Sequence, residues 1–462
     1  MRSSSLRRTR TAVVTVSCVA VAAVGLHAAR PSPARAQATA EALTWAEARA
    51  AAERRAPERA LAARRAALAE TDVAIARALP NPTFTVTTSR LTARLATGVS
   101  LPMPLFGQRH LATVVARADV DTALRESALG QSELRWNATM AWIDAWEAAA
   151  RARLVALAAA DADRLLEIAR ARFEAGSAPR LDVVRATADR ARSHAEAEGA
   201  GPLVTAAAAH LAVWVGADPI APPRVVGEPG VPAALPDLAV LVEALALSHP
   251  ALERDRAEER AATARADLER RLRLPVVSAD VMVSQWDPTT PGTDVLAGAS
   301  FELPILDQRA GSIAHAERQR DVFAAARALD DAHLRADLVD AYHRTRSGAG
   351  RAREIGRSAL PASEEARALT EESYRAGRAD LLRVLDAQRA VLELRLAERE
   401  AIGAWARAFA DLERAVGAAL PQGASDSPPS PSPSSSSSSP PPPPPPWPPG
   451  PSPLMQTAHA VR

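Results

Sequence analysis

The longest uninterrupted helical signal limits what this chain can fold into. No proline occurs between Leu105 and Ala178. A helix of about 66 residues would extend ~100 Å at 1.5 Å per residue, which no globular core can contain. A second helical stretch follows the glycine at 176, with apolar residues at heptad spacing: Leu181, Val184, Ala188, Ala191 and Ala195. The pattern predicts a long antiparallel helical hairpin whose tip lies near Gly176.

The same organisation recurs about 200 residues later. "GVSLPMPLFGQR" (98–109) matches "GASFELPILDQR" (298–309), and "LRWNATMAW" (134–142) matches "LRADLVDAY" (334–342). "RFEAGSAPRLDVV" (172–184) matches "SYRAGRADLLRVL" (373–385), which aligns Gly176 with Gly377. A repeat of this kind means that one architecture is present twice in the chain. We therefore expect a second long hairpin with its tip near Gly377 and a heptad seam at Leu381, Leu385, Leu392 and Leu396.

Period-two alternation precedes each long hairpin. Residues 81–106 and 275–304 alternate apolar and polar side chains, as in strands with one apolar face, and each is preceded by a helix that ends before a proline. The sequence thus predicts a first repeat over 37–220, a linker over 221–236 and a second repeat over 237–420. Each repeat comprises a helix, a β-hairpin and a long α-hairpin. The fold class is mainly α with a small β part.

The two ends of the chain differ from the repeats. Basic residues precede an apolar run over 11–26, and an A-x-A sequence ends at Ala36. This layout predicts a secretory signal peptide over 1–36. The one cysteine, Cys18, lies inside it, so we expect a mature chain without disulfides or an N-terminal lipid. Residues 421–462 are rich in Ser and Pro, and we expect them to be disordered.

Composition and motifs argue against several classes of function. The 56 basic and 54 acidic residues are interspersed, which is typical of solvated helix faces and argues against nucleic-acid binding. The chain contains none of the G-x-S-x-G, HExxH or P-loop motifs. The nine His residues are scattered, without the spacing of a metal site. We therefore expect no enzyme activity, no cofactor and no bound structural metal.

The predicted strands pose a closure problem. Two β-hairpins supply four strands, which cannot form a closed barrel, and an open sheet edge cannot lie in lipid. Strands that span a membrane must then be pooled from several chains, and three chains would give a plausible twelve. The runner-up interpretation is a periplasmic adaptor or a soluble coiled-coil scaffold. Neither alternative explains two tandem copies that each carry alternating strands.

Together, the paired tip sequences, the paired "PLFGQR" and "PILDQR" strand ends and the duplication resemble the TolC-type outer-membrane efflux channels over residues 43–420. The strand endings are similar to those of the heavy-metal (CzcC/CusC-like) branch. The resemblance implies a homotrimer with a 12-stranded transmembrane β-barrel and a periplasmic α-barrel. It also implies a location in the outer membrane, contact with its lipid and a periplasmic adaptor that joins an inner-membrane pump, most often of the RND type. Drugs, solvents and secreted polypeptides remain open as substrates beside metal cations.

The resemblance also implies roles for residues near the two tips. In this family the tip turns contact the adaptor, and the matching positions are Phe173, Gly176, Ser177, Leu181, Tyr374, Gly377, Arg378 and Leu382. The family closes its periplasmic end with acidic residues after the second tip. Asp386 matches one of these, Arg383 stands where another acid is usual, and Asp182 is the counterpart in the first repeat. Alternatively, the tip residues only form turns, and the two aspartates only stabilise helix N-termini.

Overall fold

The structure of the chain is a computed structural model that describes residues 42–420, apart from residues 90–93, 230, 233, 286–291 and 303. The predicted signal peptide and the Ser/Pro-rich tail lie outside the described residues. Within them, the fold is mainly helical with one small sheet and one two-residue strand pair, which confirms the predicted fold class.

Each repeat begins with two helices. In the first repeat, β1 (Ala42–Leu43) leads into α1 (Trp45–Arg55) and α2 (Pro57–Arg77). In the second repeat, the equivalent helices are α5 (Leu238–Ser248) and α6 (Pro250–Arg271). The short helices α1 and α5 were not expected from the sequence. Proline at the first position of α2 and of α6 separates each pair, because it starts a helix readily but cannot continue one.

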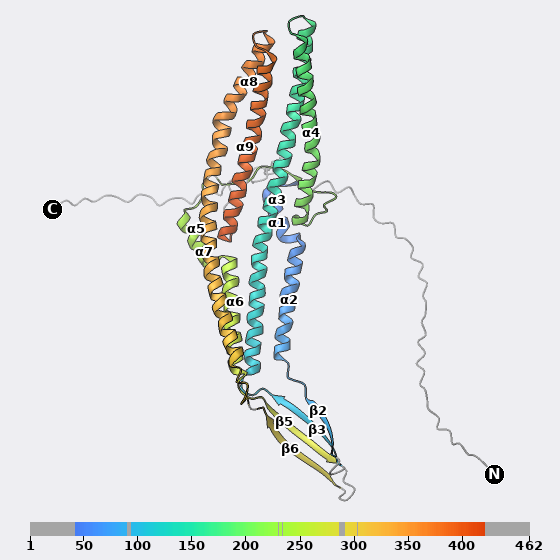
Figure 1. Cartoon of the computed structure of the whole chain (residues 1–462), viewed down its shortest axis with the longest axis vertical. Helices are drawn as coiled ribbons and strands as arrows, with labels where there is room; N and C mark the ends of the chain where they lie inside the picture. Colours follow the sequence, from blue (N-terminus) through green and yellow to red (C-terminus); the bar gives the residue numbers. More distant parts are fainter. Residues whose placement is uncertain are drawn as a thin grey trace, which may run out of the picture. The chain divides into compact units, whose positions relative to one another are not determined.

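The long hairpins form most of the molecule that the structure describes (Figure 1). The first consists of α3 (Gln108–Glu174) and α4 (Arg180–Val215), and α3 is 67 residues long. The second consists of α7 (Ala310–Glu354), a π-helical turn η1 (Ile355–Ala359), α8 (Leu360–Arg375) and α9 (Leu381–Val416). The π-helical turn explains a shift in the repeat. The offset between the copies is 200 at Leu134/Leu334 but 201 at Gly176/Gly377, and a π-bulge accommodates one inserted residue within a helix.

The helices pack in an order that changes along their length. Nearer the tips, neighbouring contacts give the order α4, α3, α9, α8. Nearer the sheet, they give the order α2, α3, α6, α7. Four helices therefore lie side by side at each level, with α4 and α8, or α2 and α7, at the two edges (Figure 1).

One four-stranded antiparallel sheet joins the two repeats. Its order is β2 (Thr83–Ser89), β3 (Arg94–Met103), β5 (Val277–Gln285) and β6 (Thr293–Phe301). The central pairing, β3 with β5, places Val99 opposite Val281 and Ser100 opposite Asp280. One face is apolar and exposed, with Phe84, Val86, Val99, Leu101, Val281, Val295 and Phe301. The opposite face carries Thr or Ser on all four strands, together with Asp280, Asp294, Met282 and Leu296.

A cluster of aromatic residues forms the core where the first repeat meets the linker. Trp45 packs edge-to-face on Trp142, with 5.4 Å between the ring centroids. The indole N–H of Trp142 donates to the carbonyl oxygen of Leu43, and that of Trp146 donates to the carbonyl oxygen of Gly227. The linker also contains β4 (Arg224–Val225), which pairs with β1 in parallel. These contacts fix the linker against the middle of the helices.

Both return helices end in the same way. The C-cap glycines Gly216 and Gly417 have φ angles of 67° and 79°. A Cβ on Gly216 would lie 2.6 Å from the carbonyl oxygen of Arg55, and one on Gly417 would lie 2.5 Å from Cδ of Pro250. Only glycine permits this approach. In each repeat, the end of the return helix therefore packs in the same way against the junction of the first two helices, α1 and α2 in the first repeat and α5 and α6 in the second. Among the described residues, no helix combines the length and the low charge that a membrane-crossing helix requires.

Candidate functional site

The two hairpin tips are the first candidate site, because they lie together and most of the residues expected to act are there. Gly176 and Gly377 each follow a helix end with φ angles of 71° and 76°. The N–H of Ser177 donates to the carbonyl oxygen of Arg172, and the N–H of Arg378 donates to that of Ser373. Both chain reversals are therefore the same glycine-dependent turn.

A buried apolar cluster joins the two tips, and we call it the tip cluster. It consists of Leu165, Leu166, Ala169, Ala186, Tyr374, Leu381, Val384 and Leu385. These side chains come from α3, α4, α8 and α9, so both hairpins contribute. Tyr374 and Leu381 are 0% exposed. The tips are thus one packed unit rather than two independent turns.

Tyr374 does not have the environment that the sequence comparison implied. We expected it to contact an adaptor, but its complete burial in the tip cluster removes it from any docking surface. Its hydroxyl donates to Oδ2 of Asp182 over a long 3.5 Å. Burial raises the pKa of the Tyr374 phenol, and the charge of Asp182 raises it further. Tyr374 therefore holds the tips together.

Arg172 completes this junction and has no recognisable signal in the sequence. Nη1 donates to the carbonyl oxygen of Tyr374 at 2.7 Å, and Nη2 donates to that of Ser177 at 3.0 Å. The guanidinium also lies over the Tyr374 ring, 4.3 Å from its centroid. A single side chain of the first hairpin thus binds the turns of both hairpins. Its counterpart in the second repeat is Ser373, which cannot do the same.

The three residues expected at the gate differ in their exposure. Asp182 is buried in the first turn of α4, whereas Asp386 and Arg383 are exposed on α9. The Arg383 guanidinium lies 3.7 Å from Asp380, the N-cap of its own helix. Within this chain, Arg383 therefore pairs with a residue at the start of its own helix. At 77% and 66% exposure this pair contributes little stability.

The other expected tip residues remain accessible. Phe173 is 44% exposed, Leu181 is 52% exposed and Leu382 is 44% exposed. Gly176, Ser177, Gly377 and Arg378 are also exposed. An apolar surface therefore remains around the turns after Tyr374 is excluded.

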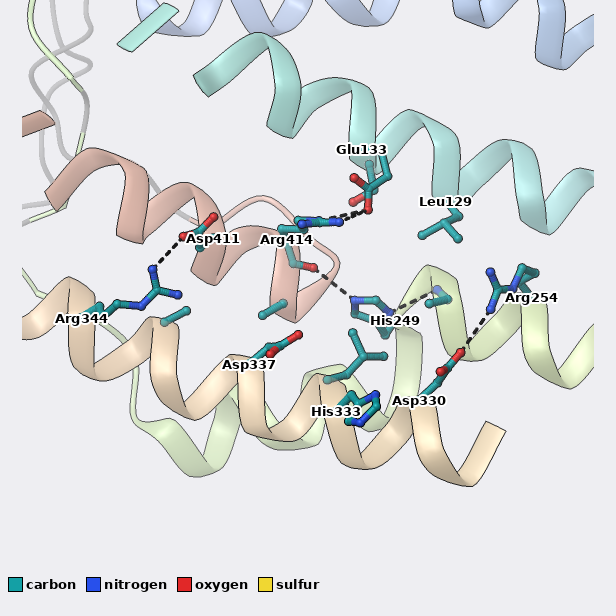
Figure 2. Close-up of a pocket in the computed structure, with 15 residues that line it drawn as sticks. Leu129, Glu133, His249, Arg254, Asp330, His333, Asp337, Arg344, Asp411 and Arg414 are labelled. Atoms are coloured by element: carbon teal, nitrogen blue, oxygen red, sulfur yellow. Dashed lines mark hydrogen bonds and ion pairs between the residues drawn. The ribbon is translucent and has the colours of Figure 1, made fainter. Parts of the chain in front are cut away.

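A polar cleft of about 460 Å³ between α3, α6, α7 and α9 is the second candidate site (Figure 2). Three ion pairs cross it, and each joins different helices: Arg414–Glu133, Arg254–Asp330 and Arg344–Asp411. They leave its charges largely balanced. No group of three or more His, Cys, Asp or Glu in the described part of the chain is placed to hold a metal ion. The charged residues of the cleft are best explained as ion pairs that hold the helices together.

His249 lies beside this cleft with both ring nitrogens engaged (Figure 2). Nδ1 accepts from the N–H of Ala251 and so caps α6, while Nε2 lies 3.1 Å from the carbonyl oxygen of Arg414. The proton must then be on Nε2, because a carbonyl oxygen can only accept. Burial lowers the pKa of His249. The ring is therefore a neutral structural link between α6 and α9.

Comparison with known proteins gives consistent results. Residues 241–418, most of the second repeat, match the outer membrane efflux protein family. The chain is 24% identical over 348 residues to the cobalt-zinc-cadmium resistance protein CzcC of Cupriavidus metallidurans, which covers 74% of this chain and 82% of that protein. The structure of the outer-membrane channel OprN is similar with a TM-score of 0.67 at 19% identity, over 81% of this chain and 90% of OprN. CusC is similar with a TM-score of 0.67 at 14% identity, over 81% of this chain and 92% of CusC.

Proposed function

We propose that the chain is the outer-membrane channel of a tripartite efflux system, because residues 241–418 match the outer membrane efflux protein family and the chain is similar to CzcC. In this role it is a passive exit duct and catalyses no reaction. An inner-membrane pump of the RND type supplies the energy, and a periplasmic adaptor connects the two proteins. The observation that carries the proposal is the sheet, whose apolar face is exposed in the single chain.

Three copies of the chain would complete the structure. The sheet has two free edges, β2 and β6, which a ring of three chains would pair to give twelve strands. The helical edges carry exposed apolar side chains at heptad spacing. These are Leu61, Leu68 and Ile75 on α2 and Val322 and Leu329 on α7. Pairing the α2 edge of one chain with the α7 edge of the next would bury both stripes in a closed, heterologous ring.

The tips are the proposed docking and closing end. Phe173, Leu181 and Leu382 offer an apolar surface to the helical hairpin of the adaptor. Opening of the duct would require the two hairpins to separate, and the contacts that resist this are those of Arg172 and Tyr374. Asp386, exposed on α9, is then a rim residue of the opening. Asp182 would contribute to the closure indirectly, because it accepts the hydrogen bond of the Tyr374 hydroxyl.

Metal cations are the proposed substrate class. The supporting observation is the similarity to CzcC, whose name states resistance to cobalt, zinc and cadmium. The alternative functions, a periplasmic adaptor and a soluble scaffold, would leave the exposed apolar face of the sheet in water. A patch of this kind favours an interacting or membrane surface.

Fractionation and a deletion strain test the proposal. We expect the protein in the outer-membrane fraction as a trimer that dissociates only on heating. We also expect the deletion strain to become more sensitive to zinc, cobalt or cadmium. A soluble periplasmic monomer would contradict the channel itself. An outer-membrane trimer whose loss changes only drug or dye sensitivity would contradict the substrate class alone.

A further inference from the structure

The hydroxyl-bearing face of the sheet contains one charged residue at its middle, Asp280. It is the fourth of the nine residues of β5, and its lateral partners are Ser100 on β3 and Gly298 on β6. The Asp280 carboxylate accepts hydrogen bonds from the hydroxyls of Ser100 and Ser300. Two neighbouring strands thus hold the side chain in place. No atom lies within 4 Å of where a Cβ on Gly298 would be, so the space beside Asp280 is open.

The four strands carry three charged residues: Arg94 at the start of β3, Asp280 within β5 and Asp294 near the start of β6. Asp294 lies opposite Ser284, which is four residues beyond Asp280 on β5 and on the same face, about 13 Å away at 3.3 Å per residue. Asp280 is therefore the charged residue well inside the sheet, with Ser100 and Ser300 beside it, whereas Arg94 and Asp294 lie at the loop ends of their strands.

The opposite face determines where Asp280 points in the assembled channel. Phe84, Val99 and Val281 are 66%, 44% and 49% exposed in the single chain, and they share the apolar face. In a transmembrane barrel the apolar face contacts lipid and the polar face lines the lumen. Given the proposed trimeric channel, on which this inference rests, three Asp280 carboxylates would lie at one level around the lumen.

We propose that Asp280 sets the charge selectivity of the channel, through a ring of three carboxylates that favours cations over anions in the strand region. Rings of acidic side chains select cations in other pores, because a fixed negative potential concentrates counter-ions near the wall. The position is distinct from the helical tips, since the 67-residue α3 separates the sheet from the tip by about 100 Å. At the tip, Arg383 replaces an expected acid. The three Asp280 carboxylates would supply, in the strand region, the negative charge that is missing at Arg383 in the tip.

The test uses the purified full-length trimer in planar bilayers under a KCl gradient, with the reversal potential as the readout. For Asp280→Asn we expect the K⁺ to Cl⁻ permeability ratio to fall by about twofold to threefold at 0.1 M salt, and less at 1 M, where screening is stronger. Asp280→Glu should keep the wild-type ratio. Asp280→Asn with Ser300→Asp should restore it, because position 300 lies on the same face beside Asp280.

The outcomes separate this inference from the proposed function. A conducting Asp280→Asn trimer with the wild-type permeability ratio would overturn the inference and leave the channel function intact. Failure of the wild-type trimer to conduct would contradict the channel function instead. If Asp280→Asn does not assemble, Asp280→Ser gives the same measurement with a smaller polar side chain and the same expected fall.

Discussion

The return helices α4 and α9 occupy equivalent positions in the two repeats, yet their environments differ. The expected seam of α4 is exposed throughout: Leu181, Val184, Ala188, Ala191 and Ala195. On α9, Leu381 and Leu385 are buried and Leu392 and Leu396 are half-buried. The reason is position, because α9 lies between α3 and α8 whereas α4 is at an edge. A heptad pattern therefore indicates that a helix has an apolar seam, but not whether its own chain covers that seam.

The tips show the same divergence at the level of single residues. Phe173 and Tyr374 are equivalent positions, and they are 44% and 0% exposed. Val184 and Leu385 are also equivalent, and they are 55% and 4% exposed. The first copy retains an outward apolar surface, while the second copy supplies the centre of the tip cluster. At these two pairs of positions, the first copy is exposed and the second copy is packed inside the tip cluster.

Substitution of the two equivalent aromatic residues should give the largest contrast. Tyr374→Ala removes a fully buried ring from the tip cluster and should destabilise the tips by about 3–5 kcal/mol. Phe173→Ala should cost less than about 0.5 kcal/mol, because its ring is largely in solvent. Hydrogen exchange of the amides in α8 and the start of α9 measures this local stability. Equal effects of the two substitutions would contradict the assignment of the packing role to Tyr374 alone.

Substitution of Arg172 should give the second-largest effect, because this side chain of the first hairpin donates hydrogen bonds to the turns of both hairpins. Arg172→Gln loses two hydrogen bonds from a charged donor and a cation–π contact, and should cost about 1.5–3 kcal/mol in the closed state. We expect a higher resting conductance of the trimer in planar bilayers. Arg170→Gln is the matched control, with the same loss of charge at an exposed position two residues earlier on α3. An unchanged conductance for Arg172→Gln would show that these contacts do not keep the duct closed.

A smaller, pH-dependent effect should distinguish the helix starts of the two repeats. His249 caps α6, whereas Ala56 at the start of α2 provides no side-chain cap. Because burial lowers the folded pKa of His249 below its ordinary 6.5, its contribution is complete above pH 6.5. That contribution is lost as the pH falls from 6.5 toward the lowered value, since the unfolded chain then binds more protons.

Thermal unfolding of the trimer at several pH values measures this contribution. His249→Gln should cost about 1 kcal/mol at pH 7.5 and should reduce the loss of stability between pH 7 and pH 5. Ala56→Ser should instead add a cap of about 0.5–1 kcal/mol at every pH. A wild-type protein as sensitive to acid as the His249→Gln variant would show that this histidine is not the titrating link.

Much of the fold was accessible from the sequence, for identifiable physical reasons. Proline and glycine positions mark the helix ends, and period-two alternation marks the strands, so both tip glycines and all four strands of the sheet could be recognised. The pairing of β3 with β5 and the burial of Tyr374 could not, because both depend on contacts between repeats. Arg172 has no sequence motif, since its role arises from backbone oxygens that only the fold brings together.

Paired cysteines on the two edges test the ring of three chains most directly. Val184 on α4 is eight residues after Gly176, and Leu369 on α8 is eight residues before Gly377, so both lie at the same level below the tips. Both are exposed, at 55% and 59%, on opposite edges of one chain with α3 and α9 between them. A disulfide within one chain is therefore impossible, because it requires Cα atoms within about 7 Å.

The chain's one natural cysteine, Cys18, lies in the predicted signal peptide, so no other thiol should interfere. The account predicts that mild oxidation of Val184→Cys/Leu369→Cys in outer membranes yields covalent dimers and trimers and nothing larger. Each single-cysteine variant should yield no covalent trimer. A double variant that stays monomeric, or that forms a ladder beyond three chains, would contradict a closed trimeric channel.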